Sequence, residues 1–203
     1  MFFNKIINLE EYKSSKTIAI YKSMKDEVNT KKLIEYSFCN KKTVVLPRVE
    51  GNNMDFYKIN SLYDKYEKSK LGVEEPISDI NNLIEPSKID LIIVPGVCFD
   101  IYKNRLGFGK GFYDRFLCNT KIKKIAICFE EQIMKNTRLP ITNNDIKMDI
   151  IVTNTEEEDL EVYHDSKDII CPECQETCLL NIEDYKINLY GCKNRHKTKN
   201  IPL

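Results

Sequence analysis

The stretch RLGFGKGFYDRF, residues 105–116, combines three glycines, three basic side chains and an acid within twelve residues. Four of the seven glycines of the chain fall within residues 96–111. Glycine is costly in backbone entropy, so such clustering indicates backbone that adopts positive φ or closely approaches another group. Backbone N–H groups at a glycine-rich turn before a helix can bind an anion, and positive charge is added here by Arg105, Lys110 and Arg115. The stretch predicts a phosphate site; a purely structural turn is the alternative.

The glycine spacing matches neither a Walker A loop nor the dinucleotide pattern G-x-G-x-x-G, which has an acidic residue about 20 positions later. Asp114, one turn into the helix expected over residues 111–118, could supply a hard oxygen ligand to Mg²⁺ bound to phosphate. The alternative for Asp114 is an acid that the helix dipole favours near the N-terminus.

Four cysteines crowd into residues 171–192. Two metal-ligand knuckles, Cys171-x₂-Cys174 and Cys192-x₃-His196, are separated by 17 residues, which predicts a tetrahedral Zn²⁺ site resembling a zinc ribbon. Cys178 is an alternative or bystander ligand, and cysteines without metal, or disulfides, are the competing interpretations. The intervening LLNIEDYKINLYG alternates as the hairpin of a ribbon would. The basic residues around His196 leave a nucleic-acid or protein docking role open.

Composition narrows the class of protein. The 203 residues carry 31 basic and 31 acidic side chains, so no global basic field favours nucleic-acid binding. No apolar run approaches the length of a membrane span, and the first residues do not form a signal peptide, so we expect a cytosolic protein. We also expect a monomer. The other four cysteines are scattered: Cys39, Cys98, Cys118 and Cys128. Three of these four lie in apolar segments, where a free thiol packs as a small core residue.

The elements that must position the glycine loop are short strands alternating with helical stretches. IDLIIVP (89–95) is apolar apart from Asp90, as a central parallel strand buried on both faces would be. A helix is expected over KKLIEYSF, capped by Asn29 or Thr30. Further strands are expected at 16–21, 43–47, 55–59, 123–129 and 148–153. The strand over 55–59 is a candidate for an edge of the sheet. The pattern predicts an α/β fold with an open, mostly parallel sheet, whose ligands bind beyond the carboxyl ends of the strands.

Composition shifts after Thr153. We expect a main domain over 1–155, an acidic linker over 156–168 and a zinc-binding ribbon over 169–203.

VPGVCFDIYKNRLGFGKGFYDRFL (94–117) strongly resembles the signature of the 5-formyltetrahydrofolate cyclo-ligase, or methenyltetrahydrofolate synthetase, family. The resemblance extends through IAIYKSMKDEVNT (18–30), VVLPRV with NNMDFYKI (44–59), EEP (74–76), FEEQI (129–133) and LPITNNDIKMDIIVT (139–153). It covers roughly residues 2 to 153. It implies conversion of 5-formyltetrahydrofolate and ATP to 5,10-methenyltetrahydrofolate, ADP and phosphate, with Mg²⁺.

The resemblance also implies roles for particular residues. It implies catalytic roles for Arg105, Lys110 and Tyr113, and Mg²⁺ ligation by Asp114 and Asp145. The ATP-phosphate loop would comprise Arg105, Leu106, Gly107, Phe108, Gly109, Lys110, Gly111, Phe112 and Tyr113. Folate would be contacted by Lys22, Glu27, Phe108, Gly109, Lys110, Gly111 and Phe112. The alternatives are a solvated acid for Glu27 and a turn residue for Asp145.

Two departures from the family pattern stand out. Asn144 takes a place where many members have histidine. The family opens with a helix bearing a Lys…Leu-Arg motif that reaches ATP, and nothing in MFFNKIINLEEY is expected to replace it. The competing hypothesis is therefore a catalytically degenerate cyclo-ligase fold that acts through its zinc module as a binding or interaction protein.

Overall fold

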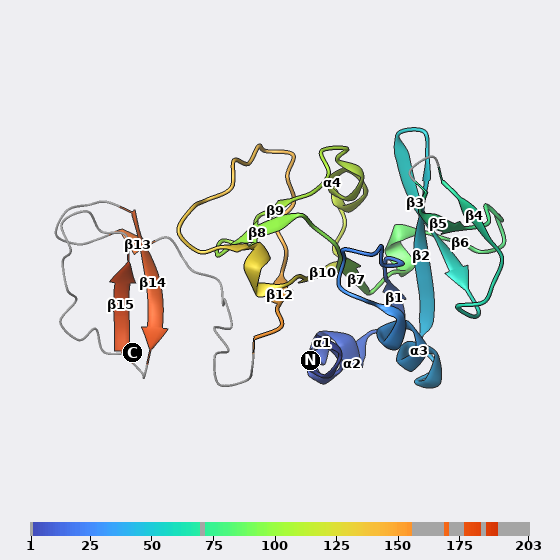
Figure 1. Ribbon diagram of the computed structural model, residues 1–203, viewed down its shortest axis with the longest axis horizontal. Coiled ribbons are helices and arrows are strands. Elements are labelled where there is room, and N and C mark those ends of the chain that lie inside the picture. The colour runs from blue at the N-terminus through green and yellow to red at the C-terminus, as the bar shows by residue number, and fades with distance from the viewer. Residues whose placement is uncertain (1, 70–71, 156–168, 171–176, 184–185, 191–203) are drawn as a thin grey trace. The chain divides into compact units, whose positions relative to one another are not determined.

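The structure, a computed structural model, describes residues 2–69, 72–155, 169–170, 177–183 and 186–190 (Figure 1). The chain divides into two compact units, residues 1–161 and 162–203. The expected linker, 156–168, lies outside the described residues, and so do Cys171, Cys174, Cys192 and His196 of the expected zinc site. No described helix has the length and apolar character needed to cross a membrane.

Helices and strands follow one another along the chain much as the alternating pattern predicts. The described helices are α1 (Phe2–Asn8), α2 (Glu10–Ser14), α3 (Lys31–Cys39) and α4 (Phe112–Leu117). The strands of the first unit are β1 (Thr17–Ala19), β2 (Thr43–Glu50), β3 (Asn53–Ile59), β4 (Tyr66–Lys68), β5 (Glu74–Pro76), β6 (Leu83–Ile84), β7 (Leu91–Val94), β8 (Cys98–Asp100), β9 (Arg105–Leu106), β10 (Lys123–Ile127), β11 (Ile133–Met134) and β12 (Ile150–Val152).

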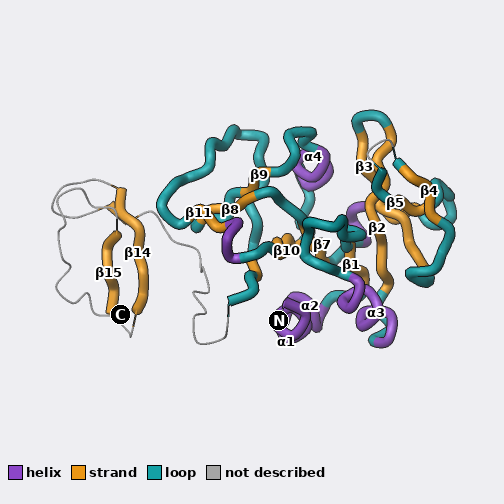
Figure 2. The backbone as a smooth tube through the Cα atoms, in the orientation of Figure 1, coloured by secondary structure: helices purple, strands orange, loops and turns teal. Residues whose placement is uncertain are grey.

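The main sheet of the described residues has seven strands in the order β12-β10-β7-β1-β2-β3-β6 (Figures 1 and 2). Each pair from β12 to β2 is parallel, whereas β3 runs antiparallel to β2 and β6 antiparallel to β3. The prediction of an open, mostly parallel α/β sheet is confirmed. The strand over 55–59 is not at the edge, because Phe56 and Tyr57 of β3 pair with the two residues of β6.

The centre of the sheet is buried on both faces. All four residues of β7 are 0% exposed, which the continuous apolar run predicts for a strand covered on both sides. One face packs on Ile6 of α1, Tyr12 of α2 and Leu33 of α3. In Figure 1 these three helices lie together below the sheet, and α4 lies on the opposite side. A contact between Phe116 of α4 and Phe56 of β3, 4.7 Å between ring centroids, helps to fix α4.

The start of the chain, where nothing is expected to replace the helix that reaches ATP in the family, forms the two short helices α1 and α2. α1 and α2 carry lysines but no arginine, and the lysines have partners within the protein. Lys5 Nζ donates to the carbonyl of Thr155 at 2.7 Å, and Lys13 pairs with Glu10 at 2.9 Å.

Two local expectations change in the structure. At the start of α3, Asn29 Oδ1 accepts from the N–H of Lys31 at 2.9 Å, whereas the hydroxyl of Thr30 donates to the carbonyl of Tyr21. Thr30 occupies the N-cap position without a side-chain cap bond, and Asn29 satisfies one N–H of the first turn. Of the four scattered cysteines only Cys128 is buried, so the expectation that three of them pack as core residues is wrong. An apolar neighbourhood in sequence does not determine which face of an element a side chain occupies.

The second unit contains β13 (Ile169–Ile170), β14 (Thr177–Glu183) and β15 (Lys186–Tyr190), antiparallel in that order. The hairpin expected from the alternation of LLNIEDYKINLYG is confirmed. Ile170, at the end of β13, pairs with Thr177, and Tyr190, at the end of β15, pairs with Leu179. β13 and β15 therefore end at the same end of this small sheet, where β14 begins.

Candidate functional site

The glycine loop connects β9 to α4 and is shaped by two kinds of constraint. Gly109 and Gly111 adopt φ values of +77° and +64°, a region that other residues enter at a cost. At Gly107 an added Cβ would lie 2.6 Å from Nη1 of Arg105, so a side chain there would require this guanidinium to shift. The expectation of positive φ and close approach is confirmed. Within the described part of the chain, nothing accepts a hydrogen bond from the backbone N–H groups of residues 107–111.

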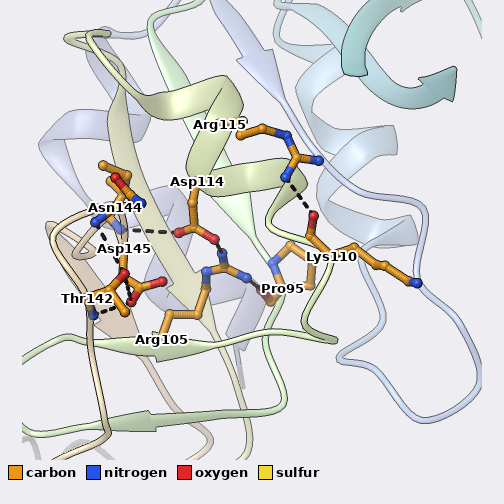
Figure 3. Close-up of polar contacts among 9 residues, drawn as sticks. Pro95, Arg105, Lys110, Asp114, Arg115, Thr142, Asn144 and Asp145 are labelled. Atoms are coloured by element: carbon orange, nitrogen blue, oxygen red, sulfur yellow. Dashed lines mark hydrogen bonds and ion pairs between the residues drawn. The ribbon is translucent and has the colours of Figure 1, made fainter. Parts of the chain in front are cut away.

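Arg105 holds the loop against α4. Its Nη2 donates to Oδ2 of Asp114 at 2.8 Å, and the two side chains are 6% and 17% exposed (Figure 3). Nη1 donates to the carbonyl of Pro95 at 3.5 Å, and the guanidinium carbon lies 5.4 Å from the ring centre of Tyr113. Loss of one partner of such a poorly solvated ion pair would leave the other charge uncompensated, which is strongly destabilising. In this structure Arg105 therefore orients Asp114, and its charge is already compensated.

The other two cations of the loop differ in what they contact. Nη2 of Arg115 donates to the carbonyl of Asn52 at 2.8 Å, and Nη1 donates to the carbonyl of Lys110 at 2.8 Å. Arg115 thus ties the β2–β3 turn to the loop, and Figure 3 shows its bond to the carbonyl of Lys110. The ammonium of Lys110 is exposed and has no hydrogen-bond or ion-pair partner among the described residues. Of the three basic side chains, Lys110 is the one placed to receive an anion.

The two expected magnesium ligands are brought to one place. Asp114 Oδ1 accepts from the N–H of Ile146 at 3.2 Å, which places Asp145 in the segment that contacts Asp114 (Figure 3). Asp145 Oδ2 accepts from the N–H of Thr142 at 2.6 Å and from its hydroxyl at 3.0 Å, so Asp145 is also the turn residue that the alternative interpretation proposed. Asn144, in the same turn, donates its N–H to the Thr142 hydroxyl at 3.3 Å.

This pair of carboxylates fits Mg²⁺ by donor type. The described residues contain no group of three or more His, Cys, Asp or Glu side chains able to hold a metal ion by themselves. Mg²⁺ does not need such a cage, because it keeps several waters and takes oxygens from phosphate together with one or two carboxylates. Asp114 and Asp145 could therefore hold Mg²⁺ only together with a phosphate-bearing ligand.

A cleft of about 360 Å³ lies beyond the carboxyl ends of β1, β7 and β10. Its volume is within the usual range of small-molecule sites. The cleft is lined by Tyr21, Met24, Asp26, Glu27, Val28, Pro95, Gly96, Val97, Phe108, Ile127 and Gln132. Glu27 and Phe108 were predicted from sequence, and Phe108, 72% exposed, brings the glycine loop to the edge of the cleft. The position is the one expected for an open parallel sheet.

Burial raises the pKa values of two ionisable groups near the cleft, Glu27 and Tyr113. Burial raises the pKa of Glu27, and the hydrogen bond from the N–H of Met24 to Oε2, 2.8 Å long, partly opposes this shift. Burial also raises the pKa of Tyr113, with the positive charge of Arg105 opposing and the negative charge of Glu27 adding to the rise. Tyr113 therefore stays a neutral hydroxyl that can donate a hydrogen bond to a ligand, and it does not act as a base near neutral pH.

Lys22 lies elsewhere. Its Nζ pairs with Glu74 of β5 at 2.6 Å and lies 3.5 Å from the centre of the Tyr66 ring. Lys22 is not among the described residues that line the cleft. A contact between Lys22 and a ligand stays a prediction, and such a contact would have to compete with Glu74.

Sequence reasoning missed several residues of the cleft. Gln132 is the clearest, because its Nε2 donates to the carbonyls of Gly96 and Val97 at 3.0 and 2.9 Å and fixes the wall of the cleft. The hydroxyl of Tyr21 donates to the carbonyl of Val28 at 3.0 Å and holds the turn that carries Glu27. Tyr21 ends the strand expected over 16–21, and Gln132 follows the strand expected over 123–129 by three residues. Position at the carboxyl end of a parallel strand is the sequence signal that could have identified both residues. Met54 and Phe56 are buried, 6% and 1% exposed, and belong to the core.

Known proteins resemble this chain over the first unit. A model of the 5-formyltetrahydrofolate cyclo-ligase family matches residues 1–154. A 5-formyltetrahydrofolate cyclo-ligase of Mus musculus is 33% identical over 160 residues, which cover 73% of this chain and 78% of the mouse protein. The solved structure of 5,10-methenyltetrahydrofolate synthetase from Aquifex aeolicus superposes with a TM-score of 0.64 at 36% identity and covers 75% of each chain. A 5,10-methenyltetrahydrofolate synthetase from Mycoplasma pneumoniae gives a TM-score of 0.57 at 26% identity, covering 74% of this chain and 80% of that one.

Proposed function

Because this chain belongs to the 5-formyltetrahydrofolate cyclo-ligase family, we propose that it converts 5-formyltetrahydrofolate and ATP to 5,10-methenyltetrahydrofolate, ADP and phosphate. The observation that carries the proposal is the contact between the two parts of the site. Phe108 belongs both to the glycine loop and to the lining of the cleft, so a ring bound in the cleft would lie beside a phosphate bound at the loop. The reaction requires this adjacency.

The chemical problem is that a formamide oxygen is a poor leaving group. Transfer of the γ-phosphoryl group of ATP to that oxygen gives an imidate phosphate and ADP. The neighbouring folate nitrogen then attacks the formyl carbon, the ring closes, and the carbon–oxygen bond breaks with release of phosphate. Catalysis of phosphoryl transfer depends mostly on positioning and on compensation of charge.

The residues of the loop suit that task. The exposed ammonium of Lys110 and the unbonded N–H groups of residues 107–111 would bind phosphate oxygens of ATP. The neutral hydroxyl of Tyr113 would donate a hydrogen bond, and Arg105 would act by fixing Asp114. When bound, Mg²⁺ would compensate phosphate charge, held by Asp114 and Asp145. Glu27 and Phe108 would contact the folate in the cleft.

A direct assay tests the proposal. Purified protein mixed with 5-formyltetrahydrofolate, ATP and Mg²⁺ should develop the absorbance of the methenyl product. Omission of ATP or of Mg²⁺ should abolish the signal. A protein that forms no methenyl product, while the mouse enzyme does so under the same conditions, would contradict the proposal.

We propose further that the second unit binds a structural zinc ion through Cys171, Cys174, Cys192 and His196. The side chains of these residues lie outside the described part of the chain, and the support comes from their spacing and from the register of the strands. Cys171 directly follows β13, and Cys192 follows the end of β15 by two residues, and both strands end at the same end of their sheet. A ribbon needs its two knuckles at one such end.

Removal of zinc should unfold the second unit selectively. We expect about one zinc per chain in protein purified under reducing conditions, because structural sites of this kind hold one tetrahedral ion. Binding free energy at such a site is also folding free energy, so a chelator should expose the amides from about residue 168 onward to hydrogen exchange, while the first unit stays protected. Cys171→Ser should abolish zinc binding, and Cys39→Ser should preserve it. Elemental analysis without zinc would reject the ribbon, and collapse of the first unit on chelation would reject its independence.

A further inference from the structure

Asp100, at the end of β8, has a buried carboxylate. This carboxylate links residues 102–104 to Leu139, which lies in a separate segment of the chain. It is 0% exposed, and its two oxygens accept four hydrogen bonds from uncharged donors. Oδ1 accepts from the N–H groups of Tyr102 at 3.0 Å and Asn104 at 2.9 Å. Oδ2 accepts from Nδ2 of Asn104 at 2.8 Å and from the N–H of Leu139 at 2.9 Å. Burial of a carboxylate is costly unless hydrogen bonds compensate it, and here they come from both segments.

Asn104 is held in this cluster at a cost. It is 2% exposed, and its Oδ1 is buried without a hydrogen-bond partner among the described residues. An unpaired buried acceptor is destabilising, and such exceptions in folded proteins need an explanation. Nδ2 of Asn104 is directed at Asp100, and the next residue, Arg105, forms the ion pair with Asp114. The cluster thus lies at the base of the glycine loop.

Leu139 is the first point at which a strap, residues 139–148, is attached to the rest of the unit. In the middle of the strap the N–H of Ile146 donates to Asp114, and at its end the N–H of Met148 donates to the carbonyl of Lys103 at 2.9 Å. Between these attachments residues 140–145, including Asp145, are exposed. Asp145 therefore lies between two anchored points, Leu139 on Asp100 and Ile146 on Asp114, and without the bond to Asp100 the strap would be held at its Ile146 end alone.

We propose that Asp100 is a positioning residue that holds the strap against the β8–β9 hairpin, so that Asp145 lies beside Asp114 before the Mg²⁺-nucleotide arrives. Asp100 makes no contact with substrate and acts through Asn104 and Leu139. The role in Mg²⁺-nucleotide binding rests on the function proposed above. The mechanical part, anchoring of the strap, rests only on the hydrogen bonds of Asp100.

Asp100→Asn tests both parts. The amide replaces an acceptor by a donor, so at least one of the four bonds becomes a contact between two N–H donors. Hydrogen exchange of peptides spanning residues 139–147 should accelerate by about 10-fold or more, because the strap opens locally. In calorimetry, the Mg²⁺ concentration that gives half-maximal ADP binding should rise about 10- to 100-fold, as when a group that orients a metal ligand is removed. Binding of 5-formyltetrahydrofolate should change less than about two-fold, because residues 139–148 of the strap contribute nothing to the lining of the cleft.

Asp90→Asn is the matched control. Asp90 also accepts two backbone N–H groups, those of Lys16 and Thr17 at 2.8 Å each, but it precedes β7 at the opposite end from the cleft. This variant should leave the strap and the Mg²⁺ dependence unchanged. Asn104→Ala deletes one donor and the unpaired oxygen, keeps the three backbone bonds to Asp100, and should give a smaller effect of the same kind. If Asp100→Asn does not fold, Asn104→Ala decides the question.

Unchanged exchange of residues 139–147 in a folded variant would overturn the proposal. Equal weakening of folate and Mg²⁺-ADP binding would also overturn it, because general destabilisation would then explain the loss. A parent protein that forms no methenyl product would reject the proposed function, and hydrogen exchange would still decide whether Asp100 anchors the strap.

Discussion

Asp114→Asn should raise the Mg²⁺ concentration needed for half-maximal rate by about 100-fold or more. An amide lacks the negative charge that holds a hard cation, and loss even of groups that only orient a metal ligand costs about 10- to 100-fold. A steady-state titration of rate against Mg²⁺ at saturating ATP measures the shift. Asp145→Asn should shift the same titration in the same direction, because Ile146 holds its segment against Asp114.

Asp114→Asn should also lower the free energy of unfolding. The sequence motif does not suggest this effect on stability. Arg105 is 6% exposed and would lose the charge of its partner, although the asparagine can still accept one hydrogen bond. Loss of a charge-assisted bond in such a place costs about 1.5–3 kcal/mol, measurable by urea denaturation. Asp64→Asn is the control, since among the described residues Asp64 accepts only the N–H of Asn60, at 2.8 Å. Titrations identical to the parent for both Asp114→Asn and Asp145→Asn would remove the magnesium assignment.

Lys110→Ala should weaken ATP binding and turnover by about 1.5–3 kcal/mol, the loss of one charge-assisted hydrogen bond to phosphate. That range corresponds to about 10- to 150-fold in the equilibrium constant. The fold should be unaffected, because the ammonium of Lys110 has no partner among the described residues. Calorimetry with ATP and steady-state kinetics measure the two effects.

A matched lysine separates local from general charge effects. Lys88 is exposed, lies before β7 at the opposite end of the sheet from the cleft, and pairs only loosely with Glu85 at 3.7 Å. Lys88→Ala should leave nucleotide affinity and rate unchanged. If Lys110→Ala behaves like Lys88→Ala, the glycine loop is not the phosphate site, and the positive φ of Gly109 and Gly111 then serves a turn alone.

The sequence by itself determined the class of fold, the place of the loop and the family. The largely apolar run 89–95 predicts a strand covered on both faces, and its residues 91–94 form β7, 0% exposed throughout. The clustered glycines predicted a loop with positive φ, and Gly109 and Gly111 have it. These conclusions are accessible because hydrophobic period and backbone sterics act over a few neighbouring residues.

Only the tertiary structure decided which charged groups remain available to a ligand. In sequence, Arg105, Lys110 and Arg115 are three equivalent cations. In the fold Arg105 meets Asp114, and Arg115 reaches the carbonyl of Asn52, 63 positions away, which leaves Lys110. A side chain has the same type whether a partner within the protein or a ligand satisfies it, and the partner depends on where distant turns place the backbone. For the same reason the sequence did not reveal Asp100, whose bond to Leu139 spans 39 positions.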